Sequence, residues 1–307
     1  MPNTYNLLLT NTINYSPLRY PGGKSCLSNF IQEIAKLNGV IGGVYMELYA
    51  GGAGAALNLL FNGTFSRIHI NDYDYNVYAM WYTILNHHRA FINRINNTEV
   101  TIEEWHNQKA IFEKGHKANI VDLGFATFFL NRTNRSGIIF KAGPIGGLNQ
   151  TGNYKIDVRF NKERLIERIE KIVTRKNDIF LTNLDAVEIL SNIQIHKRGL
   201  GGIFVYLDPP YYNKGKELYL NNYKHDNHLS LADTIRNIEN VKWLISYDNV
   251  QEIKQMYEGY RMSSFDLNYT LQTKKFGSEL LIFCDDLRLP DNITIKNRQG
   301  ELTLINE

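Results

Sequence analysis

The chain contains 307 residues, of which 43% are hydrophobic and 12% aromatic, and its formal net charge is +3. That is enough apolar material for one large core, or for one core and a smaller inserted unit. Its apolar runs are shorter than the ~18 residues needed to cross a bilayer, which excludes a membrane-spanning protein on sequence grounds. The polar residues 1–15 do not resemble a secretory signal, so we expect a cytoplasmic protein.

Two cysteines, Cys26 and Cys284, are too few for a zinc site or a disulfide framework, and we expect no metal. Cys26 lies close to Lys24, which would suit a nucleophile. A small residue in the first turn of a helix is the favoured interpretation.

Short β-like runs recur along the chain, each followed by a loop with polar or glycine residues. They cover residues 44–49, 67–71, 179–182, 204–207, 243–246 and 280–284. Amphipathic helical stretches, such as 55–61 and 229–238, lie between several of them. This alternation predicts an α/β fold with a Rossmann-like, doubly wound and mostly parallel sheet. Such sheets bind ligands beyond the carboxyl ends of their strands.

The alternation stops between residues 98 and 161. This stretch has a predicted helix, an aromatic patch and a loop rich in Gly and Asn, at 102–113, 125–129 and 143–152. We expect 98–161 to be an inserted, largely helical and loop domain, and 1–97 and 162–307 to form the sheet domain. The amphipathic helix 162–175 would lead the chain back to the sheet.

The tetrapeptide Asp208-Pro209-Pro210-Tyr211 directly follows the predicted strand 203–207. Prolines cannot donate a ladder hydrogen bond, so the strand ends there and Asp208 is held at its carboxyl edge. A carboxylate and the Pro209 carbonyl can accept the two N–H hydrogens of an adenine amino group, which leaves its lone pair pointing at an electrophile. Tyr211 can stack on a base swung out of a duplex. We interpret the four residues as catalytic; a rigid turn without chemistry is the alternative.

A glycine-rich segment, Glu47-Leu48-Tyr49-Ala50-Gly51-Gly52-Ala53-Gly54, ends the first strong strand and opens a helix. Its small residues let a ligand approach the helix N-terminus. Asp72 follows Gly51 at the spacing expected for a residue that binds ribose hydroxyls. A dinucleotide frame starting at Gly52 has Leu57 at its third glycine position, so a nucleoside cofactor without pyrophosphate, such as S-adenosylmethionine, fits better. The candidate cofactor residues are Glu47, Tyr49, Gly51, Gly52, Gly54 and Asp72, with core packing as the alternative for Tyr49.

The segment Arg19-Tyr20-Pro21-Gly22-Gly23-Lys24-Ser25 ends like a phosphate-binding loop. A Walker sequence needs a glycine where this chain has Leu18, which excludes that loop. A flexible turn with a cation and an aromatic remains, and it suits the methionine end of S-adenosylmethionine; a surface turn is the alternative. The candidate cofactor residues here are Tyr20, Gly22, Gly23 and Lys24.

Basic residues gather in the predicted insertion, where six of them between residues 129 and 162 face one acid, Asp157. Such an excess either neutralises phosphates or forms a solvated face. Asn and Arg side chains also suit base edges, although they can equally cap local turns. The candidate DNA-binding residues are Arg19, Asn131, Arg132, Asn134, Arg135 and Lys141.

Together these segments resemble the Dam-type (D12 class) adenine-N6-specific DNA methyltransferases. The likeness covers residues 17–285 and rests on segments in the order that the family uses. They are 19–24, 47–54 followed by Ile70-Asn71-Asp72, 208–211, and the closing strands 243–249 and 279–283. The resemblance implies transfer of a methyl group from S-adenosylmethionine to adenine N6 in a specific double-stranded DNA sequence.

The resemblance also implies individual roles. Tyr20 and Lys24 would contact the cofactor, Asp72 would bind its ribose, and Asp208 would contact both substrate amine and cofactor. Residues 179–185, which end at Asp185, would lie beside the cofactor's adenine. The insertion resembles a target-recognition domain.

Two departures from the family pattern affect the cofactor wall and the target. Leu48-Tyr49 replaces the usual Pro-Phe pair, which keeps an aromatic wall but adds a hydroxyl. The loop 143–154 differs from that of the GATC-specific members, so their target sequence does not carry over.

The resemblance implies double-stranded DNA as partner, a bacterial, phage or viral setting, and a monomer or weak dimer, with no metal and no membrane. A cognate restriction endonuclease is a candidate partner. The alternatives are a methyltransferase for cytosine N4, RNA or protein glutamine, and a catalytically silent DNA-binding relative. The motif order favours adenine in DNA, and the retention of Lys24, Asp72 and Asp208 argues against a silent protein.

Overall fold

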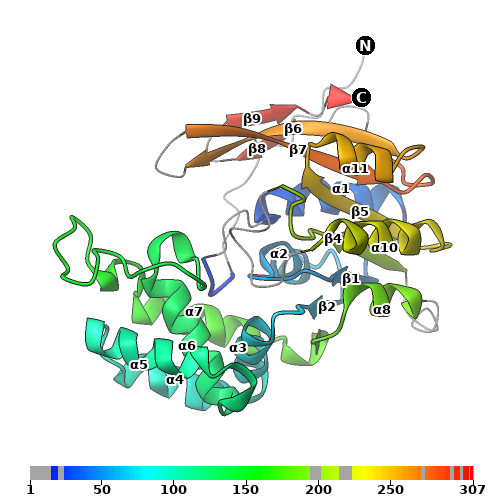
Figure 1. Ribbon diagram of the computed structural model, residues 1–307. Coiled ribbons are helices and arrows are strands. Elements are labelled where there is room, and N and C mark those ends of the chain that lie inside the picture. Colours follow the sequence, from blue (N-terminus) through cyan, green and yellow to red (C-terminus); the bar gives the residue numbers. More distant parts are fainter. Residues whose placement is uncertain are drawn as a thin grey trace.

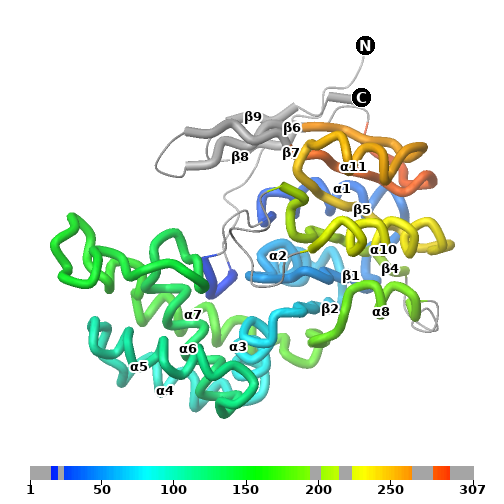
Figure 2. The backbone as a smooth tube through the Cα atoms, viewed as in Figure 1, coloured from blue at the N-terminus to red at the C-terminus, as the bar shows by residue number. Residues whose placement is uncertain are grey.

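The centre of the protein is an eight-stranded sheet with the strand order β10-β6-β7-β5-β4-β1-β2-β3 (Figure 1). The computed structural model describes residues 15–19, 24–193, 202–213, 223–270, 274–290, 294–297, 300–303 and 305–306, and the others are drawn as a thin grey trace in Figure 1. Figure 2 follows the same backbone as a tube in the same view. The strands of the sheet are β1 (Val44–Glu47), β2 (Arg67–Asn71), β3 (Ile179–Thr182), β4 (Ile203–Leu207), β5 (Lys242–Asp248), β6 (Arg261–Thr270), β7 (Lys274–Phe283) and β10 (Ile305–Asn306). A separate hairpin is made by β8 (Thr294–Asn297) and β9 (Gly300–Thr303).

Strands β3, β2, β1, β4 and β5 pair in parallel, whereas β7, β6 and β10 continue the sheet in antiparallel fashion. Every residue of β1 and β4 is buried, because the sheet is covered on both faces. The predicted α/β fold with a mostly parallel sheet is therefore confirmed. Each of the six predicted runs coincides with a strand for most of its length, although 44–49 extends two residues beyond β1 and 280–284 extends one residue beyond β7. Strands β6 and β10 of the sheet were not predicted.

The helices around the sheet form two groups, which cover its two faces (Figure 1). The first group is the 3-10 turn η1 (Lys24–Leu27) with α1 (Ser28–Leu37) and α2 (Gly54–Phe61). The second is α8 (Ala186–Ser191), α10 (His225–Arg236) and α11 (Gln251–Met256). The parallel strands thus lie in a continuous core and direct their carboxyl ends to one edge.

Five further helices form a layer beside the sheet, at the lower left of Figure 1. This helical layer consists of α3 (Tyr75–Asn86), α4 (His88–Asn97), α5 (Ile102–Glu113), α6 (Ile120–Thr133) and α7 (Lys162–Val173). Helix α6 packs on α3 and α5, and its Phe125 and Phe128 rings meet Phe91 of α4 edge to face. The limits expected for the insertion, 98 and 161, stay a prediction, and the hydrophobic core continues across both.

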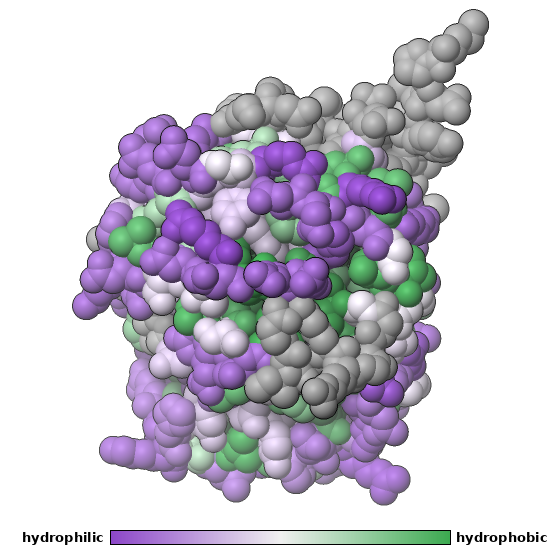
Figure 3. Space-filling view, turned by 90° about the vertical axis from the view of Figure 1, so that its right-hand side faces the viewer, coloured by the Kyte–Doolittle hydropathy of each residue, from purple (hydrophilic) through white to green (hydrophobic). Residues whose placement is uncertain are grey.

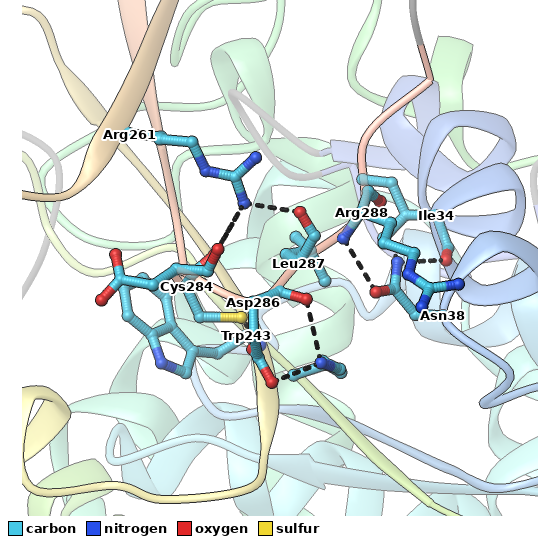
Figure 4. A network of polar contacts seen from close by, with 10 residues as sticks. Ile34, Asn38, Trp243, Arg261, Cys284, Asp286, Leu287 and Arg288 are labelled. Carbon is cyan, nitrogen blue, oxygen red and sulfur yellow. Dashed lines mark hydrogen bonds and ion pairs between the residues drawn. The ribbon is translucent and has the colours of Figure 1, made fainter.

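A network of polar contacts lies at the end of the sheet where β5 begins (Figure 4). The Arg261 guanidinium donates to the carbonyl oxygens of Cys284 at 3.0 Å and Leu287 at 2.5 Å. The Lys242 ammonium pairs with the Asp286 carboxylate at 2.5 Å and donates to the Asp286 carbonyl at 3.0 Å. These charged groups thereby hold the turn that follows β7 against β5 and β6.

Asn38 fastens the same turn to α1. As the C-cap residue of that helix, it donates from Nδ2 to the carbonyl oxygens of Ile34 and Arg288, both at 2.8 Å. Its Oδ1 accepts the backbone N–H of Arg288 at 2.9 Å. One amide therefore satisfies the end of a helix and a chain segment 250 residues away.

Figure 3 shows the face on the side away from the helical layer, where hydrophilic side chains predominate and hydrophobic ones form smaller patches. Among the described helices, none combines the length and the apolar character that a membrane span requires.

Candidate active site

The Asp208–Pro209–Pro210–Tyr211 turn lies at the carboxyl end of β4, in the middle of the sheet. Strand β4 is buried up to Leu207, and the prolines end it. The Asp208 side chain is 21% exposed, so its carboxylate leaves the core at the ligand-binding edge. The sequence-based placement of this carboxylate at a strand end agrees with the structure.

Lys24, in η1, reaches the same turn from the other end of the sequence. Its Nζ lies 3.0 and 3.1 Å from the two carboxylate oxygens of Asp208, and 3.0 Å from the Tyr211 hydroxyl. The Lys24 side chain is only 3% exposed. The structure thus joins two of the segments that the sequence singled out. Tyr20, Gly22 and Gly23, which precede Lys24, lie outside the described residues.

Strand β5 supports the catalytic turn with two polar residues. Ser246 donates from Oγ to Asp208 Oδ1 at 2.7 Å. The Asp248 carboxylate accepts the backbone N–H groups of Tyr212 at 2.8 Å and Asn213 at 3.1 Å. Sequence reasoning missed both residues. Their spacing of two puts them on one face of a strand that neighbours β4, which is a usable signal once the strand order is known.

Strand β7 adds a buried acid, Glu279. Its carboxylate accepts a hydrogen bond from the Tyr211 hydroxyl, and Oε2 lies 3.5 Å from Lys24 Nζ. The side chain is 1% exposed. In the sequence, Glu279 stood out only as the start of a closing strand. An acidic residue directly before the apolar run 280–283 was the signal that could have marked it.

The glycine-rich segment after β1 lies at the same sheet edge. Glu47 accepts the backbone N–H of Ala56, in the first turn of α2, at 2.9 Å. Burial raises the pKa of Glu47 to about 8. Gly51 has φ of 46°, a left-handed conformation that glycine adopts without strain, and its carbonyl accepts Trp81 Nε1 at 2.9 Å.

Asp72 follows β2 and faces this segment. Its carboxylate accepts the backbone N–H groups of Gly51 at 2.7 Å and Asp74 at 2.9 Å. Burial, and then the charge of Asp74, raise the pKa of Asp72 to about 7. Asp72 therefore contacts the glycine-rich segment directly, while its predicted role in binding a ribose stays a prediction.

The segments around β1 and α2 also come close to η1. A Cβ atom on Gly54 would lie 3.3 Å from Ser25 Cβ, so a small residue is needed where α2 begins. Gly52 lies between Gly51 and Gly54 in the same turn and is buried. The described candidates of the two segments, Lys24 with Glu47, Gly51, Gly52 and Gly54, therefore lie in one region.

Tyr49 and Asp185 lie at the rim of this region. The Tyr49 hydroxyl is 2.7 Å from that of Tyr223, and the two rings meet edge to face. Asp185 is exposed and caps α8 by accepting the Val187 N–H at 2.8 Å. Asn71, which the sequence marked only as part of the segment Ile70-Asn71-Asp72, donates to the carbonyls of Leu48 and Leu184. It thereby connects the residues after β1 to the loop before α8.

Three of the six expected DNA-binding side chains are buried, with 0% exposure for Asn131, 9% for Arg132 and 1% for Asn134. Asn131 accepts the Arg19 N–H at 2.7 Å and donates to the Arg19 and Gly137 carbonyls. Arg132 donates to the Arg159 carbonyl, and Asn134 donates to those of Ile138 and Ile139. These side chains are used inside the protein, where they hold the loop after α6 and the Arg19 segment.

The other three expected DNA-binding residues have more solvent access. Arg135 and Lys141 are exposed, and Arg19 is half-buried. Arg135 makes one weak contact, from Nε to the Pro144 carbonyl at 3.4 Å. Contact with DNA stays a prediction, and among the six residues Arg135 and Lys141 are the most accessible for it.

Burial raises the pKa of the Cys26 thiol to about 11, which agrees with a packed thiol and not with a reactive thiolate. Within the part of the chain that the structure describes, no group of three or more His, Cys, Asp or Glu side chains is arranged to hold a metal ion.

The fold is an α/β fold of the Rossmann-like methyltransferase type, and the polar side chains described above gather at the carboxyl ends of β1, β2, β4 and β5. Residues 20–271 match the family of D12 class N6 adenine-specific DNA methyltransferases. The match includes Lys24, Asp72 and Asp208. The chain belongs to this family, and it is an adenine-specific DNA methyltransferase.

Solved structures of another methyltransferase are similar to this chain. For one structure of the rRNA methyltransferase aviRa from Streptomyces viridochromogenes, the identity is 12% and the TM-score 0.37, over 91% of this chain and 92% of that one. For a second structure of aviRa, the identity is 8% and the TM-score 0.27, over 90% and 83% of the two chains. No curated protein matches the sequence.

Proposed function

We propose that this protein transfers the methyl group of S-adenosylmethionine to the N6 amino group of adenine within a specific double-stranded DNA sequence. One observation carries the proposal. The buried Lys24 ammonium contacts both Asp208, at 3.0 Å, and the Tyr211 hydroxyl, at 3.0 Å, and so unites the cofactor turn with the catalytic turn.

The charges of the site fit such a cofactor. When bound, S-adenosylmethionine would supply an electrophilic methyl group on a positively charged sulfur. The carboxylates of Asp208 and Glu279 suit the cationic sulfur and amine, while the Lys24 ammonium suits the methionine carboxylate. Asp72 accepts two backbone N–H groups and keeps lone pairs with which to accept ribose hydroxyls.

The catalytic turn would orient the target amine. Asp208 and the Pro209 carbonyl accept its two N–H hydrogens, and the Tyr211 ring stacks on a base flipped out of the duplex. The new C–N bond forms as the C–S bond breaks, and the methylated nitrogen loses one proton, for which Asp208 is the nearest acceptor. Positioning contributes more here than acid strength.

The exposed basic side chains beside the helical layer would hold the DNA. Arg135 and Lys141 have solvent access, and Lys155 and Arg159 add positive charge nearby. Phosphate contacts of this kind make binding fall as salt rises. Asn131 would contribute through the Arg19 backbone that it holds.

The test is methyl transfer from tritium-labelled S-adenosylmethionine to duplex DNA by purified protein. We expect Asp208→Ala to lower the rate by about 100- to 1000-fold, the usual effect of losing one preorganised polar group. Asp226→Ala, which removes an exposed carboxylate at the start of α10, is the matched control and should leave the rate unchanged. Full residual transfer by Asp208→Ala would sink the mechanism.

A further inference from the structure

Glu279 occupies a position where a carboxylate is costly. It lies in β7 directly opposite Asp248 of β5, and the exposed fractions are 1% for the Glu279 side chain and 6% for Asp248. Like charges that face each other across two strands destabilise a sheet, and burial adds a desolvation cost. Asp248 is compensated by the backbone N–H groups of Tyr212 and Asn213. Glu279 requires compensation of another kind.

The partners of Glu279 are two side chains of the proposed active site. The Tyr211 hydroxyl donates to its Oε1, and Lys24 Nζ lies 3.5 Å from its Oε2. Lys24 also contacts Asp208 and the Tyr211 hydroxyl. The four side chains are therefore linked by direct contacts, with Lys24 touching each of the other three. Glu279 completes this set from a strand that carries no other proposed site residue.

We propose that Glu279 is a positioning residue for methyl transfer, acting through Lys24 and Tyr211. It holds the lysine and the tyrosine at fixed places relative to Asp208. It also shares the Lys24 ammonium, so that this ammonium does not pair with Asp208 alone. The inference rests on the proposed function, because it assigns Glu279 a part in the same site.

Two physical effects follow from this arrangement. Hydrogen bonds from both Lys24 and Glu279 restrict the Tyr211 hydroxyl, and thereby the plane of the ring on which a base would stack. The second carboxylate also leaves the group of Lys24, Asp208 and Glu279 with an excess of negative charge. That excess favours a methyl donor with a positive sulfur over the neutral thioether that remains after transfer.

Glu279→Gln separates charge from shape, because glutamine keeps the length and can still accept from the Tyr211 hydroxyl. We expect kcat for methyl transfer to fall about 10- to 100-fold, the scale of a displacement of up to 1 Å. The affinity for S-adenosylmethionine should fall more than that for S-adenosylhomocysteine, which lacks the charge on sulfur. Calorimetry with both compounds measures this ratio. Glu258→Gln removes an exposed charge and is the matched control.

A double-mutant cycle with Tyr211→Phe tests whether Glu279 acts through the tyrosine. The cycle uses Glu279→Ala, which, unlike Glu279→Gln, cannot accept from the Tyr211 hydroxyl. We expect the double variant to lose clearly less activity than the product of the two single losses, since each single variant removes the same hydrogen bond. Losses that multiply, or an unchanged ratio of the two affinities, would overturn the inference. So would a lowered free energy of unfolding with normal kcat per folded molecule.

Failure of the proposed function would look different. In that case the wild-type protein itself would not methylate adenine, whatever Glu279→Gln does. A wild type that methylates adenine, with a Glu279→Gln variant indistinguishable from it in kcat and in the affinity ratio, would refute the positioning role alone.

Discussion

Charged side chains lie at both ends of the β5·β7 pair, but they are partly exposed at one end and mostly buried at the other. Where β5 begins, Lys242 and Asp286 form a pair whose side chains are 22% and 65% exposed, and Arg261 is satisfied by backbone carbonyls. Where β5 ends, Asp208 and Glu279 share the ammonium of the buried Lys24. In the first arrangement, water still hydrates the charged groups, so burial costs little free energy.

The second arrangement is expensive, because a buried charge loses hydration that one ion pair only partly replaces. Such expense is typical of functional sites, where titratable groups are held in unfavourable surroundings for the sake of a ligand. The end that carries the proposed catalytic turn differs from the other by its excess of buried carboxylates, whereas both ends are rich in polar contacts.

The largest effect is expected when the same substitution is made at the two ends. Lys24→Met leaves two carboxylates without their shared ammonium, so we expect the free energy of unfolding to fall by about 3 kcal/mol at neutral pH. Lys242→Met breaks a partly exposed pair, and we expect a loss of about 0 to 1 kcal/mol. Denaturant unfolding measures both.

Cofactor binding sharpens the same contrast. Lys24→Met should weaken S-adenosylmethionine binding by about 100-fold or more, because a buried charge-assisted contact is lost. Lys242→Met should leave the affinity as in the wild type. Equal effects of the two substitutions, on stability or on binding, would remove the distinction between the two ends.

A pH dependence is the next effect in size. Burial and the charge of Asp74 raise the pKa of Asp72 to about 7, from an ordinary value of 3.8. If ionised Asp72 binds the ribose hydroxyls, the affinity for S-adenosylmethionine should rise about tenfold between pH 6 and pH 8. Asp72→Asn should bind weakly and lose this dependence. A wild-type affinity that is flat across this range would contradict it.

The same shift has a consequence for stability of opposite sign. The folded protein holds the Asp72 proton more tightly than the unfolded chain does. The stabilisation from this group is therefore fully present below about pH 4 and is lost as the pH rises through about 7. The difference in the free energy of unfolding between the wild type and Asp72→Asn should therefore decrease as the pH rises across that window.

The smallest functional effect is expected at Asn38, in the network of Figure 4. Asn38→Ala removes hydrogen bonds to Ile34 and Arg288 and should cost about 1 to 2 kcal/mol of stability. The rate of methyl transfer per folded molecule should not change. A selective fall in kcat would show that the two ends of the sheet are coupled.

Much of the fold was predictable, because apolar runs and helical periodicity are local signals. The strands at 67–71 and 179–182 and the helix at 102–113 have the predicted limits. Helix α6 was predicted only as an aromatic patch. Its residues from Leu123 to Thr133 are all buried, so it lacks the polar face that gives a helix its period of 3.6.

Residues of the candidate site could be predicted where they belong to one sequence motif. They could not be predicted where only the pairing of strands brings them close to that motif. Asp208 and Lys24 stood out by their neighbours in the chain. Ser246 and Glu279 reach the same turn only because β5 lies beside β4 and β7 lies beside β5 in the sheet. Asn131 is the opposite case. Its residue type suggested a contact with DNA, but its side chain is buried and accepts the backbone N–H of Arg19.

The most direct test of the account is mass spectrometry of nucleosides from duplex DNA treated with the protein and S-adenosylmethionine carrying a deuterated methyl group. The account predicts that the label appears in N6-methyladenine, and that Asp208→Ala lowers its amount by at least about 100-fold. Label in N4-methylcytosine, in RNA or in a protein glutamine, with none in adenine, would contradict it.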